Sequence, residues 1–73
     1  MLSFKQVFSS TIQEIGYDEG EQMLAVKFNT GALYHYFGVP LEVARSVMNA
    51  PSVGTALNAE VKGTYKYARQ PQE

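Results

Sequence analysis

The chain has 73 residues and a mass of 8.1 kDa, with six Lys and Arg, seven Asp and Glu, no cysteine and 45% hydrophobic residues. This composition is typical of one small folded domain, and the lack of cysteine excludes disulfides, thiolate zinc sites and a cysteine nucleophile. The near-neutral charge argues against strong non-specific binding to nucleic acid. No apolar run reaches the roughly 18–20 residues that cross a bilayer, and residues 1–8 do not resemble a secretory signal. We therefore expect a cytoplasmic protein that does not bind membranes.

The first predicted strand covers residues 11–17. Its apolar alternation slips by one position between Ile12 and Ile15, which predicts a β-bulge or a late start of the strand. The polar residues 18–21 then indicate a turn, in which Gly20 can take a positive φ.

The next two predicted strands, at residues 23–28 and 32–37, are joined by a turn whose length decides which side chains meet. The earlier strand has one apolar face, formed by Leu24, Val26 and Phe28. A three-residue loop with Gly31 in the left-handed region places Tyr34 and Tyr36 beside that face. A two-residue loop places Leu33, His35 and Phe37 there instead. We favour the longer loop, because Asn29 followed by Gly at the third position suits a type I turn with a G1 bulge.

Two short helices are predicted next. Residues 41–49 have apolar side chains at helical spacing after the start signal Val39-Pro40, and Pro51 ends this helix. Ser52 is a suitable N-cap for the second helix, and Gly63 is the glycine expected just past its C-terminus. The apolar stripe of the second helix consists of Val53, Ala56, Leu57 and Val61.

Together these elements predict an α+β fold, in which a three-stranded antiparallel β-meander is followed by two short α-helices packed on one face of the sheet. Residues 64–67 are also prone to form an extended segment, with Tyr65 and Tyr67 on one side. We expect a single domain over residues 1–73, with a core at about residues 7–67 and a frayed tail at 68–73.

The sequence shows no pattern typical of catalysis or metal binding. Residues 9–11 and a lone His35 lack the orienting acid of a catalytic triad. The acidic residues 18–21 lack the length and the terminal glutamate of a calcium loop. We therefore predict no catalytic residues, no enzymatic activity, no cofactor and no metal site.

Two clusters are candidates for binding a ligand. Tyr34 and Tyr36 lie two residues apart and point to the same face, so they are either a stacking platform for nucleobases or a pair of core tyrosines. Near the C-terminus, basic and aromatic residues interleave, which suits phosphate contacts and base stacking, but also suits a surface where lysine stems cover tyrosine rings. This second cluster consists of Lys62, Tyr65, Lys66, Tyr67 and Arg69. Acidic residues gather at 14–21, so the charge is polarised along the chain.

The order of landmarks along residues 7–67 resembles a known family. The landmarks are Ser9-Ser10, Ile12, Ile15-Gly16-Tyr17-Asp18, Leu24-x-Val26-x-Phe28, Gly31, Tyr34-x-Tyr36, Val39-Pro40, Ala50-x-Ser52-x-Gly54, Asn58 and Lys62-x-x-Tyr65. This set resembles the KTSC domain family, whose hallmark is the central Tyr-x-Tyr. The family is named for the C-terminus of some lysyl-tRNA synthetases and also occurs as short bacterial and phage proteins. The resemblance implies no established activity, and it implies RNA binding only through the link to a tRNA-handling enzyme.

The chain departs from the family at Ala56-Leu57, where many members have an aromatic pair. If those aromatics bind a ligand, this chain lacks that contact, and if they belong to the core, this chain packs smaller side chains there. We expect a non-enzymatic domain that binds tRNA or single-stranded RNA, with phosphates on Lys62, Lys66 and Arg69. The alternative is a protein-interaction or self-associating module with no nucleic-acid role, in which a strand edge or an apolar patch pairs with a partner.

Overall fold

The computed structural model describes residues 3–6 and 11–71. Ser9 and Ser10, which belong to the family landmarks, and the last two residues of the predicted tail lie outside the described residues. In chain order the elements are β1 (Ser3–Gln6), β2 (Ile12–Asp18), β3 (Met23–Phe28), β4 (Leu33–Phe37), α1 (Leu41–Met48), α2 (Val53–Glu60) and β5 (Tyr67–Gln70).

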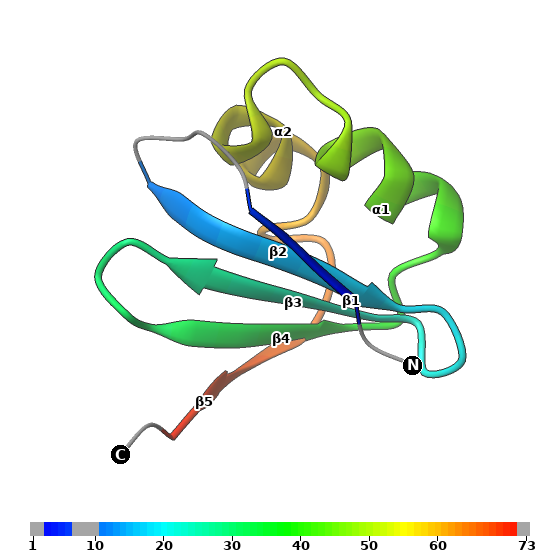
Figure 1. Cartoon of the computed structure of the whole chain (residues 1–73). Coiled ribbons are helices and arrows are strands. Elements are labelled where there is room, and N and C mark those ends of the chain that lie inside the picture. The colour runs from blue at the N-terminus through cyan, green and yellow to red at the C-terminus, as the bar shows by residue number, and fades with distance from the viewer. Residues whose placement is uncertain (1–2, 7–10, 72–73) are drawn as a thin grey trace.

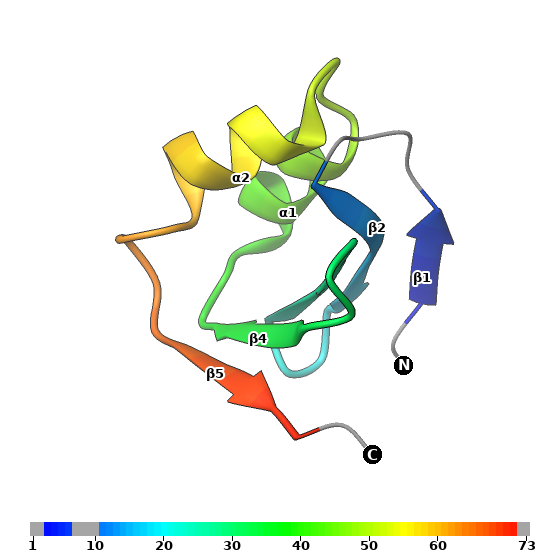
Figure 2. The same cartoon turned by 90° about the vertical axis from the view of Figure 1, so that its left-hand side faces the viewer.

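The strands of this part of the chain form one antiparallel sheet in the order β1-β2-β3-β4-β5. Both helices lie over the same face of the sheet (Figure 1). A view at right angles shows the sheet curving partly around the helices, with β1 and β5 at its two edges (Figure 2). The α+β class and the cover of one face by two helices are therefore confirmed.

The predicted count of three strands is wrong, because the sequence analysis missed both edge strands. The missed strands, β1 and β5, have four residues each and are mostly polar, with sequences SFKQ and YARQ. Short polar edges discourage pairing with other chains, and they lack the alternating apolar pattern that identifies a strand. Residues 68–70, which we assigned to a frayed tail, belong to β5, and this strand begins at Tyr67 instead of Thr64.

The predicted β-bulge in β2 is confirmed. The pairing register of β2 with β3 shifts between Ile12 and Glu14. In an unbroken strand, side chains on one face have an odd number of residues between them. The shift lets Ile12 and Ile15 point to the same face although two residues lie between them. Both side chains are fully buried in the core beneath the helices.

The three-residue loop between β3 and β4 is also confirmed. The Gly31 N–H donates to the Phe28 carbonyl at 2.9 Å, and the Phe28 N–H donates to the Ala32 carbonyl at 2.9 Å. Gly31 has a φ of +93°, which glycine adopts without strain. As a result Tyr34 pairs with Val26 and Tyr36 pairs with Leu24, on the face covered by the helices.

The helices pack their predicted apolar stripes against the sheet. Ser52 caps α2 as expected, its side chain accepting a hydrogen bond from the Thr55 N–H at 3.4 Å. The C-cap of α2 is Val61, so Gly63 lies one residue further along than the predicted position. The fully buried large side chains come from β2, β3, both helices and the segments that flank them: Ile12, Ile15, Leu24, Leu57, Val26, Val39, Val47 and Val61. No helix within the described residues is long and apolar enough to span a membrane.

Two hydrogen bonds fix the segment that leads into α1. The Val39 N–H donates to the Gln22 carbonyl at 2.9 Å, and the Tyr17 hydroxyl donates to the Val39 carbonyl. Gln22 has the positive φ of the β2–β3 turn (+51°), whereas we expected it at Gly20. This turn therefore anchors the start of α1 and sets where the helices lie over the sheet.

Candidate functional site

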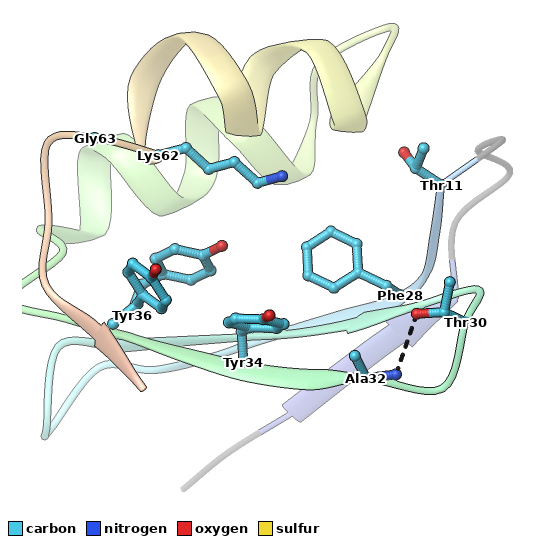
Figure 3. Close-up of a pocket in the computed structure, with 9 residues that line it drawn as sticks. Thr11, Phe28, Thr30, Ala32, Tyr34, Tyr36, Lys62 and Gly63 are labelled. Atoms are coloured by element: carbon cyan, nitrogen blue, oxygen red, sulfur yellow. Dashed lines mark hydrogen bonds between the residues drawn. The ribbon is translucent and has the colours of Figure 1, made fainter. Parts of the chain in front are cut away.

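A pocket of about 710 Å³ lies between the sheet and the end of α2 (Figure 3). Its walls carry four aromatic rings, contributed by Phe28 of β3, Tyr34 and Tyr36 of β4 and Tyr67 of β5. The rest of the lining consists of Thr11, Thr30, Ala32, Lys62 and Gly63. We call this site the tyrosine pocket. Its volume lies in the range of small-molecule sites.

The pairing of β4 with β5 creates the aromatic wall. Tyr36 lies opposite Tyr67, and Tyr34 lies opposite Arg69. Directly opposed residues in an antiparallel pair point to the same face of the sheet. The side chains of the three tyrosines and of Arg69 therefore lie next to one another on one face. The ring centroids of Tyr34 and Tyr67 are 5.6 Å apart, those of Tyr36 and Tyr67 are 5.8 Å apart, and those of Tyr34 and Tyr36 are 6.4 Å apart.

The three tyrosines differ in how far they reach solvent. Tyr36 is 3% exposed and belongs to the core, Tyr34 is half-buried, and Tyr67 is 62% exposed. Tyr34 and Tyr36 therefore do not form an open stacking platform. Instead, Tyr34 and Tyr36 pack on the core and form the inner wall of the pocket. Tyr67 adds a solvent-accessible ring beside that wall.

The tyrosine hydroxyls in the pocket are available to a ligand. Within the described part of the chain, none of the three phenol groups makes a hydrogen bond with the protein. Burial raises the pKa of Tyr36, and the neighbouring phenols of Tyr34 and Tyr67 raise it further. The Tyr36 hydroxyl is therefore protonated at neutral pH and can both donate and accept a hydrogen bond.

Lys62 brings a positive charge to the pocket. Its Nζ lies 5.0 Å from the centroid of the Phe28 ring, which is within the range of a cation–π contact, and Figure 3 shows the side chain reaching across the pocket towards that ring. Gly63, with a φ of +82°, turns the chain directly after Lys62. Among the described residues, no carboxylate pairs with the Lys62 ammonium group.

A smaller hollow of about 390 Å³ adjoins the tyrosine pocket at the β3–β4 turn. It shares Thr30 and Ala32 with the pocket, and its other lining residues are Gly31, Arg69, Gln70 and Pro71. We call it the Arg69 hollow. Arg69 is exposed, and no carboxylate among the described residues pairs with it.

The structure brings together five of the seven residues that the sequence analysis selected. Tyr34, Tyr36, Lys62 and Tyr67 line the tyrosine pocket, and Arg69 lines the adjoining hollow. The other two selected residues, Tyr65 and Lys66, lie elsewhere.

Tyr65 and Lys66 are outside both hollows for different reasons. Tyr65 is half-buried and packs against the core, because its N–H donates to the Val61 carbonyl in the turn after α2 and the strand begins only at Tyr67. Lys66 precedes β5 and alternates with Tyr67, which turns its side chain to the face of the sheet away from the helices.

Sequence reasoning missed Phe28 and Thr30 as site residues. Phe28 was assigned to the core face of its strand, and its ring does pack against the core, but one side of it also lines the pocket, edge-on to Tyr34 at 5.5 Å. In the sequence around Phe28 and Thr30, the only feature that could have indicated a site was their position at the turn that follows β3. The pairing with β5, which completes the pocket, was not visible in the sequence.

Ala56 and Leu57, where the chain departs from the family pattern, are core positions. Leu57 is 1% exposed, and Ala56 packs against the same cluster. Here the chain packs smaller side chains into the core.

The acidic residues of the β2–β3 turn lie away from the pocket. The turn at residues 18–21 is at the opposite end of β3 from the β3–β4 turn (Figure 1), a separation of about 17 Å along a six-residue strand. Across residues 3–6 and 11–71, no group of three or more His, Cys, Asp or Glu side chains is placed to hold a metal ion.

Comparison with known proteins gives consistent results. The model of the KTSC domain family matches residues 8–65. An uncharacterized protein of Stutzerimonas stutzeri is 42% identical over 62 residues, which cover 84% of this chain and 87% of that protein. A lysine–tRNA ligase of Nostoc punctiforme is 38% identical over 58 residues, which cover 80% of this chain but 10% of the ligase. The crystal structure of a KTSC domain protein from Yersinia pestis matches with a TM-score of 0.92 and 31% identity, covering 97% of this chain and 100% of that one.

Proposed function

This chain belongs to the KTSC domain family, and we propose that it is a non-enzymatic module that binds single-stranded RNA by taking one base into the tyrosine pocket. One observation carries the proposal: the accessible ring of Tyr67 and the half-buried ring of Tyr34 line the same pocket as the ammonium group of Lys62, with which no described carboxylate pairs. The similarity to a region of lysine–tRNA ligases supports an RNA partner by association.

The chemistry of the pocket favours a flat, anionic ligand. Aromatic side chains bind unstacked bases through their ring faces, and the phenol hydroxyls can hydrogen-bond to the edge of a base. The ammonium group of Lys62 repels a cationic guest and attracts a phosphate. Among the described residues that line the pocket, none is acidic. A nucleotide combines the planar ring and the negative charge that these groups select.

The proposal is tested by titrating a fluorescently labelled single-stranded RNA with the wild-type domain and two variants. Within the part of the chain whose burial is described, Tyr67 and Phe37 are the large apolar residues that are exposed, at 62% and 42%, and they lie on opposite faces of the sheet. Loss of one stacking contact costs about 1–3 kcal/mol, so we expect Tyr67→Ala to weaken binding roughly 5- to 150-fold. Phe37→Ala is the matched control and should leave the affinity unchanged. Equal effects of the two substitutions, or no binding by the wild-type domain at low salt, would exclude this function.

Self-association is a second candidate function, which the outer face of the sheet favours. This face, away from the helices, carries the exposed Phe37 together with the half-buried Met23, Leu33 and His35. Apolar patches of this kind often mark an interface. Sedimentation velocity over a range of concentrations tests it, because a dimer through this face should dissociate in Phe37→Ala, whereas a strict monomer excludes it.

A further inference from the structure

The Arg69 hollow and the tyrosine pocket are neighbours on the surface. They share Thr30 and Ala32, so the boundary between them is the β3–β4 turn. One hollow contains Lys62, the other contains Arg69, and none of the described residues that line either of them is acidic. The surface therefore has two separate cationic groups, with the aromatic rings beside one of them.

Arg69 lies where its side chain can contact a ligand bound in the tyrosine pocket. It lies opposite Tyr34 in the β4–β5 ladder, on the same face as Tyr67. Within the described residues its guanidinium group has no carboxylate partner. Guanidinium is suited to phosphate, because its planar set of N–H donors matches two phosphate oxygens.

The boundary between the hollows offers further donors. The Ala32 N–H donates to Thr30 Oγ1 at 3.5 Å (Figure 3), which is long for a hydrogen bond and hence weak. A phosphate oxygen can replace that acceptor, and the Thr30 hydroxyl can then donate to the same group.

We propose that the Arg69 hollow is a second anion subsite, which holds one phosphate of the bound RNA while Lys62 holds the phosphate on the other side of the pocketed base. This inference rests on the proposed function and makes it more specific. A nucleotide inside a strand has a phosphate on both its 5′ and 3′ sides, whereas a nucleotide at a chain end lacks one of them. The domain therefore selects an internal nucleotide, held by its base and by both flanking phosphates.

The test uses adenosine nucleotides as minimal probes: the 5′-monophosphate, the 3′-monophosphate and the 3′,5′-bisphosphate, each titrated by calorimetry. We expect the wild-type domain to bind the bisphosphate about tenfold more tightly than the better monophosphate. Arg69→Gln should weaken the bisphosphate and one monophosphate by about tenfold, and Lys62→Gln should weaken the bisphosphate and the other monophosphate. Lys66→Gln removes the same charge from the opposite face and should change none of the three affinities.

Two results would overturn the second subsite: Arg69→Gln behaving like Lys66→Gln, or Arg69→Gln and Lys62→Gln weakening the same monophosphate. Failure of this inference is distinguishable from failure of the proposed function. If labelled RNA binds the wild-type domain and Tyr67→Ala weakens that binding while Phe37→Ala does not, the proposed function holds and only the second subsite is wrong. If labelled RNA does not bind the wild-type domain at all, both are wrong.

Discussion

At the scale of single residues, we expect Tyr36 to contribute mainly to the stability of the fold and Tyr67 mainly to ligand binding. Tyr36 is buried in the core, and Tyr67 is largely exposed. Replacing a buried aromatic residue by alanine costs about 3 kcal/mol or more, which is close to the total stability of a domain this small. We expect Tyr36→Ala to be largely unfolded, and Tyr67→Ala to lose less than about 1 kcal/mol. Urea denaturation followed by circular dichroism measures both, and comparable losses in the two variants would contradict the assigned burial.

The raised pKa of Tyr36 makes stability depend on pH in the alkaline range. Burial raises its pKa in the folded state above the usual value near 10, and burial also raises the pKa of Tyr17. Below about pH 10 these phenols are protonated in both the folded and the unfolded state, so they do not make the free energy of unfolding depend on pH. Above about pH 10 the unfolded chain releases its phenol protons first, so the free energy of unfolding falls as the pH rises.

Urea midpoints of the wild-type domain and Tyr36→Phe, measured from about pH 8 to 11, isolate the contribution of Tyr36. The difference between the two proteins removes the effect of other groups that titrate there. We expect the wild-type midpoint to fall more steeply than that of the variant. Parallel curves would show that the Tyr36 phenol is not shielded from water.

At the scale of elements, the β3–β4 turn decides which face the tyrosines occupy. Gly31 has a positive φ, and a Cβ added there would meet no atom within 4 Å. Any cost of Gly31→Ala is therefore backbone strain, which we expect to lower the free energy of unfolding by about 1–2 kcal/mol. Gly20 lies in the other hairpin turn without a positive φ, so Gly20→Ala is the matched control and should change stability far less. Thermal denaturation of both variants checks this, and equal losses would contradict the turn geometry.

How much of the fold was predictable varies from element to element for physical reasons. The bulge at Ile12 and the loop at Gly31 were predictable, because a slip in apolar alternation and an Asn-Thr-Gly turn are local signals. The Ser52 cap is equally local. The edge strands β1 and β5 were not predictable, since their polar residues pair only once the central strands exist.

In the candidate site, too, the residue types were predictable from the local sequence, whereas their arrangement in space was not. Tyr34, Tyr36, Lys62 and Tyr67 were found from their residue types alone, but only as two separate clusters. Their union in one pocket depends on the pairing of β4 with β5, which joins segments separated by both helices. Long-range pairing of this kind leaves no pattern within the neighbouring sequence.

At the scale of the whole molecule, the near-neutral charge predicts weak and modestly salt-dependent RNA binding. The chain has six Lys and Arg against seven Asp and Glu, and we place only Lys62 and Arg69 on phosphates. For two contacts on a single strand, the logarithm of the affinity should fall with the logarithm of salt concentration at a slope of about −1.4. That is roughly a sevenfold loss between about 50 and 200 mM salt.

The same titration with Arg69→Gln should give about half that slope, because one phosphate contact is lost. A flat dependence in the wild-type domain would show that no phosphate is contacted. A much steeper one would place the RNA on a broader basic surface than the two hollows provide.

The central claim is that a base enters the tyrosine pocket, and the most direct measurement is a two-dimensional NMR titration of the isotope-labelled domain with a short single-stranded RNA. Stacking of a base shifts the resonances of the rings that it covers. We predict progressive shifts in the aromatic signals of Phe28, Tyr34 and Tyr67 and in the side-chain signals of Lys62, with none at Phe37 on the opposite face. Shifts confined to Phe37 and its neighbours, or no shifts at saturating RNA, would contradict the account.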